Sequence, residues 1–282
     1  MTGAAGQLGR DLVATCGAAG DDVLALGHSE LDVADRDAVH AAVLAAVPDV
    51  VFHAAAWTAV DACEADPERA FAVNALGPRN VAEASARIGA HLVHVSTDYV
   101  FDGTKPEPYV EWDVTNPMSV YGRSKLGGEQ EVVRLSPSAT VVRTSWVCGA
   151  GGSNMVKTVI HLLAEDPSRE LAFVDDQRGC PSFTSDLAPA VRRLAGARLP
   201  GTFHVTNAGP TTWFGFVQAI VVASGASADQ VRPIGTADLD PPRPAARPAN
   251  SVLDNLGLRL AGEPALPHWS EPLERLVKEL SR

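Results

Sequence analysis

The sequence has few cysteines, no long apolar run and no excess of basic residues. Its four cysteines, in 282 residues, lie far apart and form no CxxC pair, so their spacing indicates neither a disulfide framework nor a metal site. No window approaches the ~18 consecutive apolar residues of a membrane span, and the N-terminus lacks the basic start and apolar run of a secretory signal. We therefore expect a cytoplasmic protein with reduced thiols and no membrane span.

The charge balance of the chain is acidic. There are 34 Asp and Glu residues against 23 Lys and Arg, which gives a formal net charge of −11. Such a surface repels a phosphate backbone, and no stripe of Lys or Arg compensates for it. We therefore expect no nucleic-acid partner. A small anionic substrate is compatible with this composition if a few local arginines hold it.

Short apolar runs alternate with longer Ala-rich stretches over the first two thirds of the chain. Strands are predicted at residues 23–26, 50–53, 92–96 and 140–144, and helices at 8–19, 36–46, 67–88 and 121–135. Strands separated by helix-length segments imply βαβ units with right-handed crossovers, and therefore a parallel sheet. The predicted fold is α/β, a Rossmann-like doubly wound parallel sheet.

The pattern loosens after about residue 148. Helix-like stretches alternate there with short extended pieces, before a proline-rich segment and a terminal helix; the stretches are 154–164, 185–195 and 213–224, and the pieces 171–174 and 201–205. We predict a dinucleotide-binding domain at 1–148 and a smaller α/β substrate-binding domain at 149–282. Part of 175–206 could return to the first domain. The cleft between two such domains is a common place for a ligand.

The segment TGAAGQLG has glycines in a GxxGxxG spacing, at Gly3, Gly6 and Gly9. Glycines let the backbone turn tightly and approach a pyrophosphate. The following helix is predicted to start near Gln7 or Leu8, so its N-terminal amides would face the phosphates. The segment therefore predicts a nicotinamide dinucleotide site.

Almost no strand precedes this glycine turn. A dinucleotide-binding unit begins with a buried strand that leads into the turn. Either the sheet lacks its central strand, or the numbering starts downstream of the true N-terminus. We expect the second, because a missing central strand would leave two buried edges unpaired.

The end of the strand predicted at 23–26 favours NADPH slightly over NADH. NAD binders often carry a carboxylate there, whereas this chain has His28 and Ser29, without an arginine for the 2′-phosphate. Asp32 is expected either near the adenine or as a helix N-cap. Small residues that would admit a cofactor, or pack a helix tightly, follow the strand at 50–53: Ala54, Ala55 and Ala56.

Tyr121 and Lys125 form the predicted catalytic pair. They lie four residues apart on a predicted helix and so share one face. Ser96 and Thr97 end a predicted strand, where parallel sheets place their ligands. A nearby ammonium favours the phenolate, so we expect Lys125 to lower the pKa of Tyr121 from its usual value near 10. The Thr97 hydroxyl could then orient a substrate carbonyl.

With these motifs in this order, the sequence resembles the extended short-chain dehydrogenase/reductases, and within them the dTDP-4-dehydrorhamnose reductases. The resemblance runs through nearly the whole chain, in TGAAGQLG, AAAWTAVDACE, AFAVNALGP, HVSTDYVFDG, VYGRSKLGGE, VVRTSWV, FVDDQRGCPS and RPANSVLD. It implies reduction of the C4 keto group of dTDP-4-dehydro-L-rhamnose by NADPH or NADH, in a monomer or homodimer. No match to the interface glutamates that hold magnesium in some relatives is visible, so we expect no metal.

The resemblance also implies roles for individual residues. Thr97, Tyr121 and Lys125 match the catalytic positions. Asp98 and Trp146 match sugar contacts, next to Tyr99, and Arg247 is the candidate for the nucleotide pyrophosphate. The cofactor contacts implied are Gln7, Leu8, Gly9, Asp32, Val33, Ala56, Trp57 and Thr58, in addition to the glycine turn, Ala54, Ala55, Tyr121 and Lys125.

Tyr99 separates this chain from a related class. Nucleotide-sugar 4,6-dehydratases resemble it but carry Glu at that position, where the carboxylate takes a proton during elimination of water. Tyr99 cannot serve as that base at ordinary pH, so the resemblance implies ketone reduction and not dehydration.

Departures from the family pattern leave the sugar open. Cys148, Trp57 and residues 179–182 differ from the usual residues, and we expect them to touch the rim of the cleft. One alternative is a 4-ketoreductase for another nucleotide-linked deoxysugar. Another is a non-catalytic partner protein, since the regulatory subunit of methionine adenosyltransferase has a similar fold and keeps YxxxK.

Overall fold

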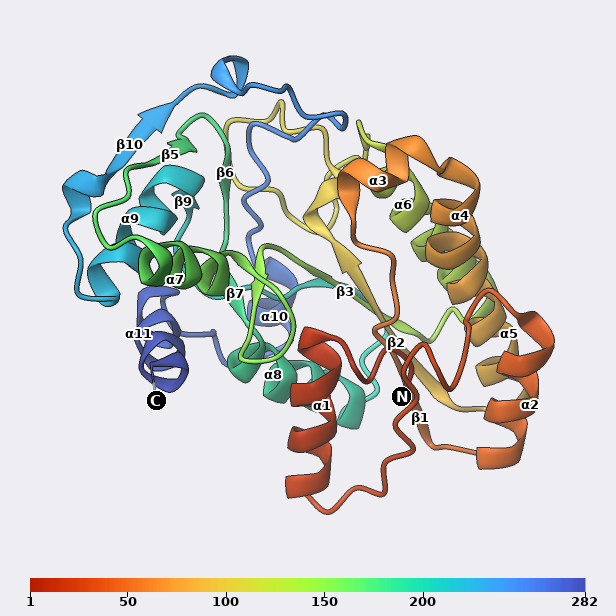
Figure 1. Ribbon diagram of the computed structural model, residues 1–282. Coiled ribbons are helices and arrows are strands. Elements are labelled where there is room, and N and C mark those ends of the chain that lie inside the picture. Colours follow the sequence, from red (N-terminus) through yellow and green to blue (C-terminus); the bar gives the residue numbers. More distant parts are fainter. Residues whose placement is uncertain (282) are drawn as a thin grey trace.

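The computed structural model describes residues 1–281. Its main sheet is parallel, in the order β1 (Val50–His53), β2 (His91–Thr97), β3 (Thr140–Thr144) and β8 (Gly201–His204). One face is covered by α2 (Arg36–Ala46), α5 (Gly77–Ile88) and α6 (Val120–Leu135), and the other by α1 (Gln7–Ala18) and α8 (Thr184–Gly196) (Figure 1). The predicted doubly wound parallel sheet is confirmed.

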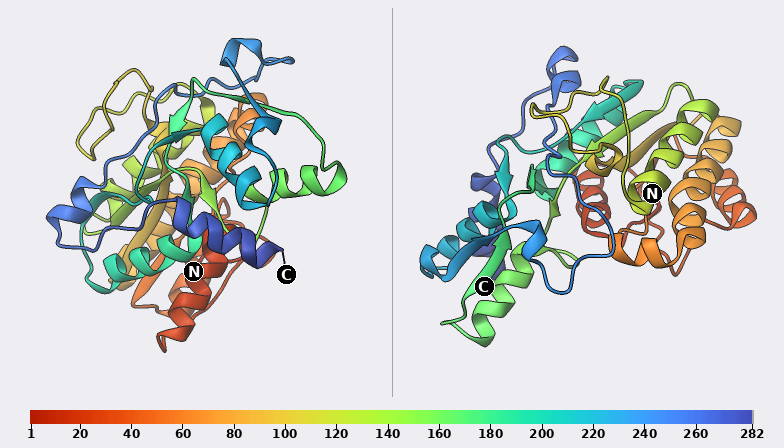
Figure 2. Two further views of the ribbon diagram at one scale, coloured as in Figure 1. Left: turned by 90° about the vertical axis from the view of Figure 1, so that its left-hand side faces the viewer. Right: turned by 90° about the horizontal axis from the view of Figure 1, so that it is seen from above.

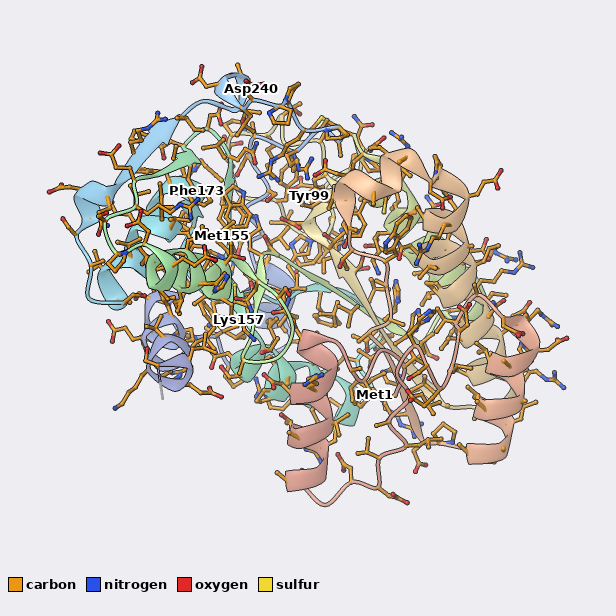
Figure 3. The ribbon with its side chains drawn as sticks, viewed as in Figure 1. Met1, Tyr99, Met155, Lys157, Phe173 and Asp240 are labelled. Carbon is orange, nitrogen blue, oxygen red and sulfur yellow. The ribbon has the colours of Figure 1, made fainter. Side chains whose placement is uncertain are left out.

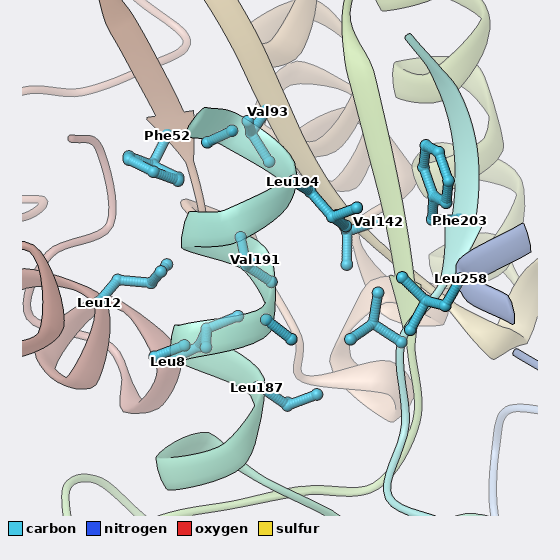
Figure 4. Packing of buried hydrophobic residues seen from close by; sticks show 14 of the residues in the cluster. Leu8, Leu12, Phe52, Val93, Val142, Leu187, Val191, Leu194, Phe203 and Leu258 are labelled. Carbon is cyan, nitrogen blue, oxygen red and sulfur yellow. The ribbon is translucent and has the colours of Figure 1, made fainter. Parts of the chain in front are cut away.

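The two faces of the sheet bury alternate residues of each strand. Phe52, Val93 and Val142 pack against α1 and α8 (Figure 4), whereas their neighbours Val51 and Leu92 pack against α2 and α5. Strands buried on both faces read as continuous apolar runs, as the sequence has them. The carboxyl ends of the strands are thereby held at one edge of a rigid core.

The start of the chain differs from the prediction. Residues 23–26 form no strand, and within them only Leu26 makes a bridge, to Thr2, which also bridges His53. Met1 and Thr2 thus lie between Leu26 and β1, where the Leu26 amide donates to the Met1 carbonyl at 2.9 Å and the Thr2 amide to Phe52 at 2.9 Å. The strand predicted at 23–26 was wrong, because the residues before Leu26 have no strand beside them. A cavity of about 770 Å³ lies there, lined by Leu24, Val50 and Arg192 among others.

The predicted helix at 67–88 is divided in the structure. It consists of α4 (Pro67–Phe71), a π-helical turn η1 (Ala72–Leu76) and α5. A short helix that was not predicted, α3 (Val60–Ala65), precedes it. π-helical turns within α-helices often mark functional sites, and this one faces α6.

The later part of the chain builds a second core. It contains α7 (Met155–Glu165), α9 (Trp213–Ala223) and α11 (Ser270–Leu280), with a parallel pair of β5 (Leu171–Val174) and β10 (Val231–Ile234) (Figures 1 and 2). Short ladders join it to the cleft side: β4 (Val147–Cys148) with β7 (Ser182–Phe183), and β6 (Arg178–Gly179) with β9 (Thr211–Thr212). The segment α8–β8 belongs to the main sheet, because β8 pairs with β3. The remaining short helices are η2 (Asp98–Val100), η3 (Ala228–Gln230), η4 (Thr236–Asp238) and α10 (Leu256–Leu260).

The proline-rich residues 239–249, here called the strap, cross from one part of the molecule to the other. The strap has no helix or strand, as the prolines predicted. It follows η4, which comes after β10, arches over the top of the molecule toward α3 and then turns back (Figure 1), with Asp240 near its start and Tyr99 below it (Figure 3). The strap therefore covers the space between the small core and the sheet edge.

Some features concern the whole of the described chain. Over residues 1–281, no helix combines the length and apolar character that crossing a membrane requires. Nowhere in that range do three His, Cys, Asp or Glu residues gather in a way that could hold a metal ion. The four cysteines are buried, and each is a free thiol.

Candidate active site

The glycine turn has a backbone that only glycine fits. Gly3 has a φ of +72°, and a Cβ there would lie 2.5 Å from the Ala55 amide nitrogen. A Cβ on Gly9 would lie 2.1 Å from the Gly3 carbonyl oxygen, while the Gly6 amide donates to that oxygen at 3.0 Å. Close approach of backbone to backbone therefore fixes the turn against the loop after β1.

The N-terminus of α1 opens onto this turn. Gly6 is its N-cap, no side chain caps the helix, and its first turn has no acidic residue. Uncapped amides at a helix N-terminus bind an anion such as a pyrophosphate. The Gln7 amide side chain instead donates to the Ser153 carbonyl at 2.9 Å, and Leu8 is in the core. These residues can therefore meet a cofactor chiefly through their backbone, and the turn fits a dinucleotide.

The loop after β1 is held in place by hydrogen bonds with Asn74 of η1. Ala54, Ala55 and Ala56 are half-buried beside the turn, and Thr58 is exposed. The Trp57 amide donates to Asn74 Oδ1 at 2.8 Å, and Asn74 Nδ2 donates to the Trp57 carbonyl at 3.0 Å. The Trp57 ring is half-buried and carries the Arg69 guanidinium 4.5 Å from its centroid.

Asp32 and Val33 lie beyond the turn, in different environments. Asp32 is exposed and accepts from the Ala34 amide at 2.9 Å. It does not cap α2, because Asp35 takes that position and accepts from two amides of the helix. The N-cap alternative for Asp32 was therefore wrong, and its contact with the adenine stays a prediction. Val33 is buried against Gly77, so only a small part of it could reach a cofactor.

A carboxylate that the sequence reasoning missed lies near the turn. Glu30 Oε2 accepts from the Gly27 amide at 2.8 Å, and Oε1 accepts from Ser29. A Cβ on Gly27 would lie 2.7 Å from this carboxylate and 3.3 Å from Ala5 Cβ, in the glycine turn. The prediction from the sequence considered residues 28 and 29 at this strand end, but the next residue, Glu30, bonds back to Gly27. A carboxylate so close to the strand end indicates a contact with the ribose.

Tyr121 lies in the first turn of α6, against the end of β2. Ser119 caps the helix by accepting from the Gly122 amide at 3.1 Å. A Cβ on Gly122 would lie 2.3 Å from the Tyr99 carbonyl oxygen, so glycine lets α6 approach Tyr99 closely. The rings of Tyr121 and Tyr99 meet edge to face, with centroids 5.6 Å apart. The helix thus brings the phenol of Tyr121 to the hydroxyl of Thr97.

The protonation of Tyr121 differs from our expectation. Burial raises the pKa of Tyr121 well above its usual value, and a hydrogen bond with Thr97 opposes this only in part. Lys125 is not among the main causes of this shift, and its Nζ donates to the Val95 carbonyl at 2.7 Å. The expected lowering of the phenol pKa was therefore wrong for this state of the chain. The phenol keeps its proton at neutral pH.

Lys125 is one of the most deeply buried charged groups in the described chain, at 2% exposed. Burial lowers the pKa of Lys125 to about 8, and Glu129 opposes the shift. Glu129 itself forms a buried pair with Arg143, with Arg143 Nη2 2.7 Å from Oε2. The Lys125 ammonium therefore loses its charge only slightly above neutral pH.

Asp98 orients the Thr97 hydroxyl. Its Oδ1 accepts from Thr97 Oγ1 at 2.9 Å and its Oδ2 accepts from Ser145 Oγ at 2.7 Å. Burial raises the pKa of Asp98, and hydrogen bonds from Ser251, Ser145 and Thr97 oppose it. Both carboxylate oxygens are occupied, so Asp98 acts through Thr97 in this structure, and its direct sugar contact stays a prediction.

Arg247 reaches the site from the strap. It forms a two-pronged ion pair with Asp61 of α3, at 2.5 and 2.6 Å, and its Nη1 also donates to the Ala245 carbonyl. Its charge also acts on Tyr99, which lies close by. The strap is thereby fastened to α3.

Trp146 follows β3 in the chain, and its ring stacks on that of Trp213 at the start of α9. Its φ is +43°, and its ring lies 3.6 Å from that of Trp213, at an interplanar angle of 9°. A Cβ on Gly179 would lie 2.4 Å from the Trp146 ring, so glycine is needed at that position. Cys148 and Cys180 are buried at 2% exposed each, and their expected contact with the cleft stays a prediction.

This geometry agrees with what comparison with known proteins finds. The sequence matches the family of the RmlD substrate binding domain over residues 1–282. It is 43% identical to a dTDP-4-dehydrorhamnose reductase of Streptomyces griseus over 279 residues, which cover 97% of this chain and 90% of that protein. The chain belongs to the dTDP-4-dehydrorhamnose reductase family.

Relatives within the family carry more than one substrate name. A Bacillus anthracis dTDP-4-dehydrorhamnose reductase in complex with NADP has a similar structure, with a TM-score of 0.94, 39% identity and coverage of 99% of this chain and 97% of that one. A Streptomyces antibioticus protein named probable dTDP-4,6-dihydroxy-2-methyloxan-3-one 4-ketoreductase is 42% identical over 284 residues, covering 99% of this chain and 94% of that protein. Identity alone therefore does not separate these two sugars.

Asn74 is a residue of this reductase whose role the sequence reasoning missed. It lies buried in η1, holds the Trp57 backbone and donates to Ser124 Oγ of α6 at 3.1 Å. A Cβ on Gly128 would lie 2.3 Å from the Asn74 carbonyl oxygen. Asn74 thus joins the loop after β1 to the helix that carries Tyr121 and Lys125. The motif AFAVNALGP contained the residue, but no local pattern indicates a π-helical turn.

Proposed function

We propose that this chain reduces the C4 keto group of dTDP-4-dehydro-L-rhamnose to give dTDP-L-rhamnose, with NADPH or NADH as the reductant. The observation that carries the proposal is the meeting of Tyr121 with Thr97, four residues from a buried Lys125, in a member of this reductase family. The glycine turn and the N-terminus of α1 supply the dinucleotide site at the same edge of the sheet, where its strands end.

The residues of the chain divide the work as follows. When the substrate binds, the Thr97 hydroxyl would turn from Asp98 to donate to the keto oxygen, and Tyr121 donates its proton to that oxygen as it becomes an alkoxide. Because burial raises the pKa of Tyr121, the phenol is protonated at neutral pH and ready to donate. The bound dihydronicotinamide supplies the hydride. Lys125 places a positive charge beside the site, and the turn from Gly3 to Gly9 holds the pyrophosphate.

Elimination of water does not fit these residues. Burial raises the pKa of Tyr99 to about 12, and Asp98 adds to the shift, while Arg247 opposes it. A phenol in this state cannot accept a proton at neutral pH. Tyr99 therefore lines the proposed sugar site as an uncharged side chain that supplies no base, which favours reduction over dehydration.

The substrate is proposed to lie under the strap. Tyr99 and Trp146 offer aromatic faces to the sugar, and Arg247 offers a guanidinium to the diphosphate. In this structure Arg247 is paired with Asp61, so binding of a diphosphate would share or replace that pair. The proposed location is the cytoplasm, the assembly a monomer or homodimer, and no nucleic-acid partner is expected.

The test is a direct assay on the purified chain. dTDP-4-keto-6-deoxyglucose is treated with a 3,5-epimerase to supply the substrate, and consumption of NADPH and of NADH is measured with formation of dTDP-L-rhamnose. We expect stoichiometric consumption and product. Binding of both ligands without any consumption would favour a non-catalytic partner protein instead.

A second candidate function is 4-ketoreduction of another dTDP-linked deoxysugar. It is supported by the 42% identity to the Streptomyces antibioticus protein named for such a reaction. The two candidates are separated by kcat/KM on several dTDP-4-keto sugars. A higher kcat/KM on a sugar other than dTDP-4-dehydro-L-rhamnose would select the second.

A further inference from the structure

Several unpartnered polar atoms lie behind Lys125, within the sheet. His94 Nδ1 and Nε2, His53 Nε2 and Ser96 Oγ are all buried without a hydrogen-bond partner. His53 on β1 and His94 on β2 are paired in register, and their rings stack with centroids 5.2 Å apart and an interplanar angle of 20°. Buried polar atoms without partners are rare and costly, so this group needs an explanation.

Lys125 adds donors to the same place. Its ammonium has three N–H donors, and the Val95 carbonyl accepts one of them at 2.7 Å. Val95 lies between His94 and Ser96 in the sequence of β2. The charge of Lys125 acts on both histidines, which places the ammonium close to their rings. The unused N–H donors of Lys125 therefore lie close to the unpartnered polar atoms of His53, His94 and Ser96.

Both imidazoles are neutral at ordinary pH. Burial lowers the pKa of His53 to about 3, with Lys125 and the N-terminal ammonium adding to the shift. Burial lowers the pKa of His94 in the same way, with Lys125 and His53 adding. A neutral imidazole has one donor and one acceptor nitrogen. His53 Nδ1 shares a hydrogen bond with Thr2 Oγ1 at 2.7 Å, whereas neither nitrogen of His94 has a protein partner.

We propose that His53, His94 and Ser96 enclose a bound water beside Lys125, and that His94 is a positioning residue for the catalytic ammonium. The water accepts a hydrogen bond from Lys125 Nζ and donates to one ring nitrogen of His94, so an unused donor of Lys125 and one unpartnered atom of His94 gain a partner. Ordered water fills this role for buried polar groups that cannot reach one another.

The consequence is an effect on the charge of Lys125. The water and the neutral imidazole solvate the ammonium where burial works against it. Burial lowers the pKa of Lys125, and Glu129 on the same helix raises it. Loss of His94 therefore shifts the balance toward burial, and the pKa of Lys125 falls further below its ordinary value.

The experiment is an NMR titration of the full chain labelled with 13C-lysine, with the Lys125 signal assigned by its loss in Lys125→Arg. In His94→Leu, which keeps the volume but removes both nitrogens, we expect the pKa of Lys125 to fall by about one unit, a tenfold change in the equilibrium. In His94→Gln, which keeps a donor and an acceptor, we expect it within ~0.3 units of the wild-type value. This readout does not depend on the proposed reaction.

His91→Leu is the matched control. His91 is a buried histidine of the same strand, but it bonds to Thr140 Oγ1 at 2.9 Å and does not act on Lys125. We expect no change in the Lys125 titration there. An unchanged titration in a folded His94→Leu protein, or an equal shift in His91→Leu, would overturn the proposal. If His94→Leu does not fold, His94→Met serves as the apolar variant with the same expectation.

A kinetic readout follows if the chain reduces its proposed substrate. The alkaline limb of the kcat profile then moves to lower pH in His94→Leu and returns in His94→Gln. A lower kcat with no movement of the limb would indicate a purely structural role and contradict the proposal.

Discussion

At the scale of single residues, burial controls the acid–base chemistry of the site. It raises the pKa of Tyr121 and lowers that of Lys125 to about 8, so the phenol stays neutral while the ammonium is close to titrating. The sequence predicted which residues would meet, because a spacing of four places them on one helix face. It could not predict the direction of the phenol shift, because a spacing does not say that Lys125 Nζ turns to the Val95 carbonyl.

Glu30 is a residue-scale test of cofactor choice. Its carboxylate accepts from the Gly27 amide next to the glycine turn, where it would repel a 2′-phosphate and accept from a ribose hydroxyl. In Glu30→Gln we expect the ratio of kcat/KM for NADPH to kcat/KM for NADH to rise roughly 3- to 10-fold. The measurement is steady-state kinetics with both cofactors.

The control for Glu30 is Glu68→Gln, an acidic residue of α4 that is also exposed. It should leave the ratio unchanged. A ratio that does not rise in Glu30→Gln would place the adenosine ribose elsewhere.

At the scale of elements, the contact between α6 and η1 aligns the catalytic residues. A Cβ on Gly128 would lie 2.3 Å from the Asn74 carbonyl oxygen, a backbone atom that cannot easily move. We expect Gly128→Ala to lower the free energy of unfolding by about 1–3 kcal/mol. We also expect kcat to fall, because α6 must shift with Tyr121 and Lys125 on it. Denaturant unfolding and kcat measure the two effects.

Gly127→Ala is the matched variant on the same helix. A Cβ there would meet only the side chains of Ala75 and Phe71, at 3.3 and 3.8 Å. We expect its stability to stay within about 1 kcal/mol of the wild type, because alanine favours the helix. Equal losses of unfolding free energy in both variants would mean that the close contact between Gly128 and the Asn74 carbonyl does not limit stability.

Most elements of the fold could be predicted from the sequence, and the misses have physical causes. Strands such as Thr140–Thr144 and helices such as Arg36–Ala46 have local patterns that tertiary contacts reinforce. The π-helical turn Ala72–Leu76 has no local signature, because its extra residue is set by packing against α6. The strand expected at 23–26 depended on a neighbour strand, which sequence patterns do not supply.

At the scale of the whole molecule, the sheet has a weak point next to Met1. The cavity of about 770 Å³ lies between residues 23–26 and β1, and the N-terminal ammonium of the half-buried Met1 donates to the Leu24 carbonyl at 2.7 Å. Burial lowers the pKa of this ammonium, so its charge is disfavoured there.

An added strand should strengthen this part of the molecule. We expect that fusing five apolar residues (Met-Ile-Val-Leu-Val) before Met1 fills the cavity, pairs with β1 and raises Tm by roughly 5 °C or more. NADPH should also bind more tightly, because the turn at Gly3 is then held from both sides. Thermal unfolding and calorimetric titration measure the two effects.

The control for the added strand is a Gly-Ser extension of the same length, which removes the ammonium from Met1 without filling the cavity. It should give only a small change in Tm. A Tm that rises equally with both extensions would show that the terminal charge, and not the missing packing, limits stability.

The central claim is that Tyr121 donates the proton in ketone reduction, and Tyr121→Phe tests it most directly. The variant keeps the ring that packs against Tyr99 and removes only the hydroxyl. We predict that kcat with dTDP-4-dehydro-L-rhamnose and NADPH falls by at least ~100-fold. Binding of dTDP should stay within ~3-fold of the wild type, since the Tyr121 hydroxyl is not among the groups proposed to hold the nucleotide. Reduction at the wild-type rate in Tyr121→Phe would contradict the account.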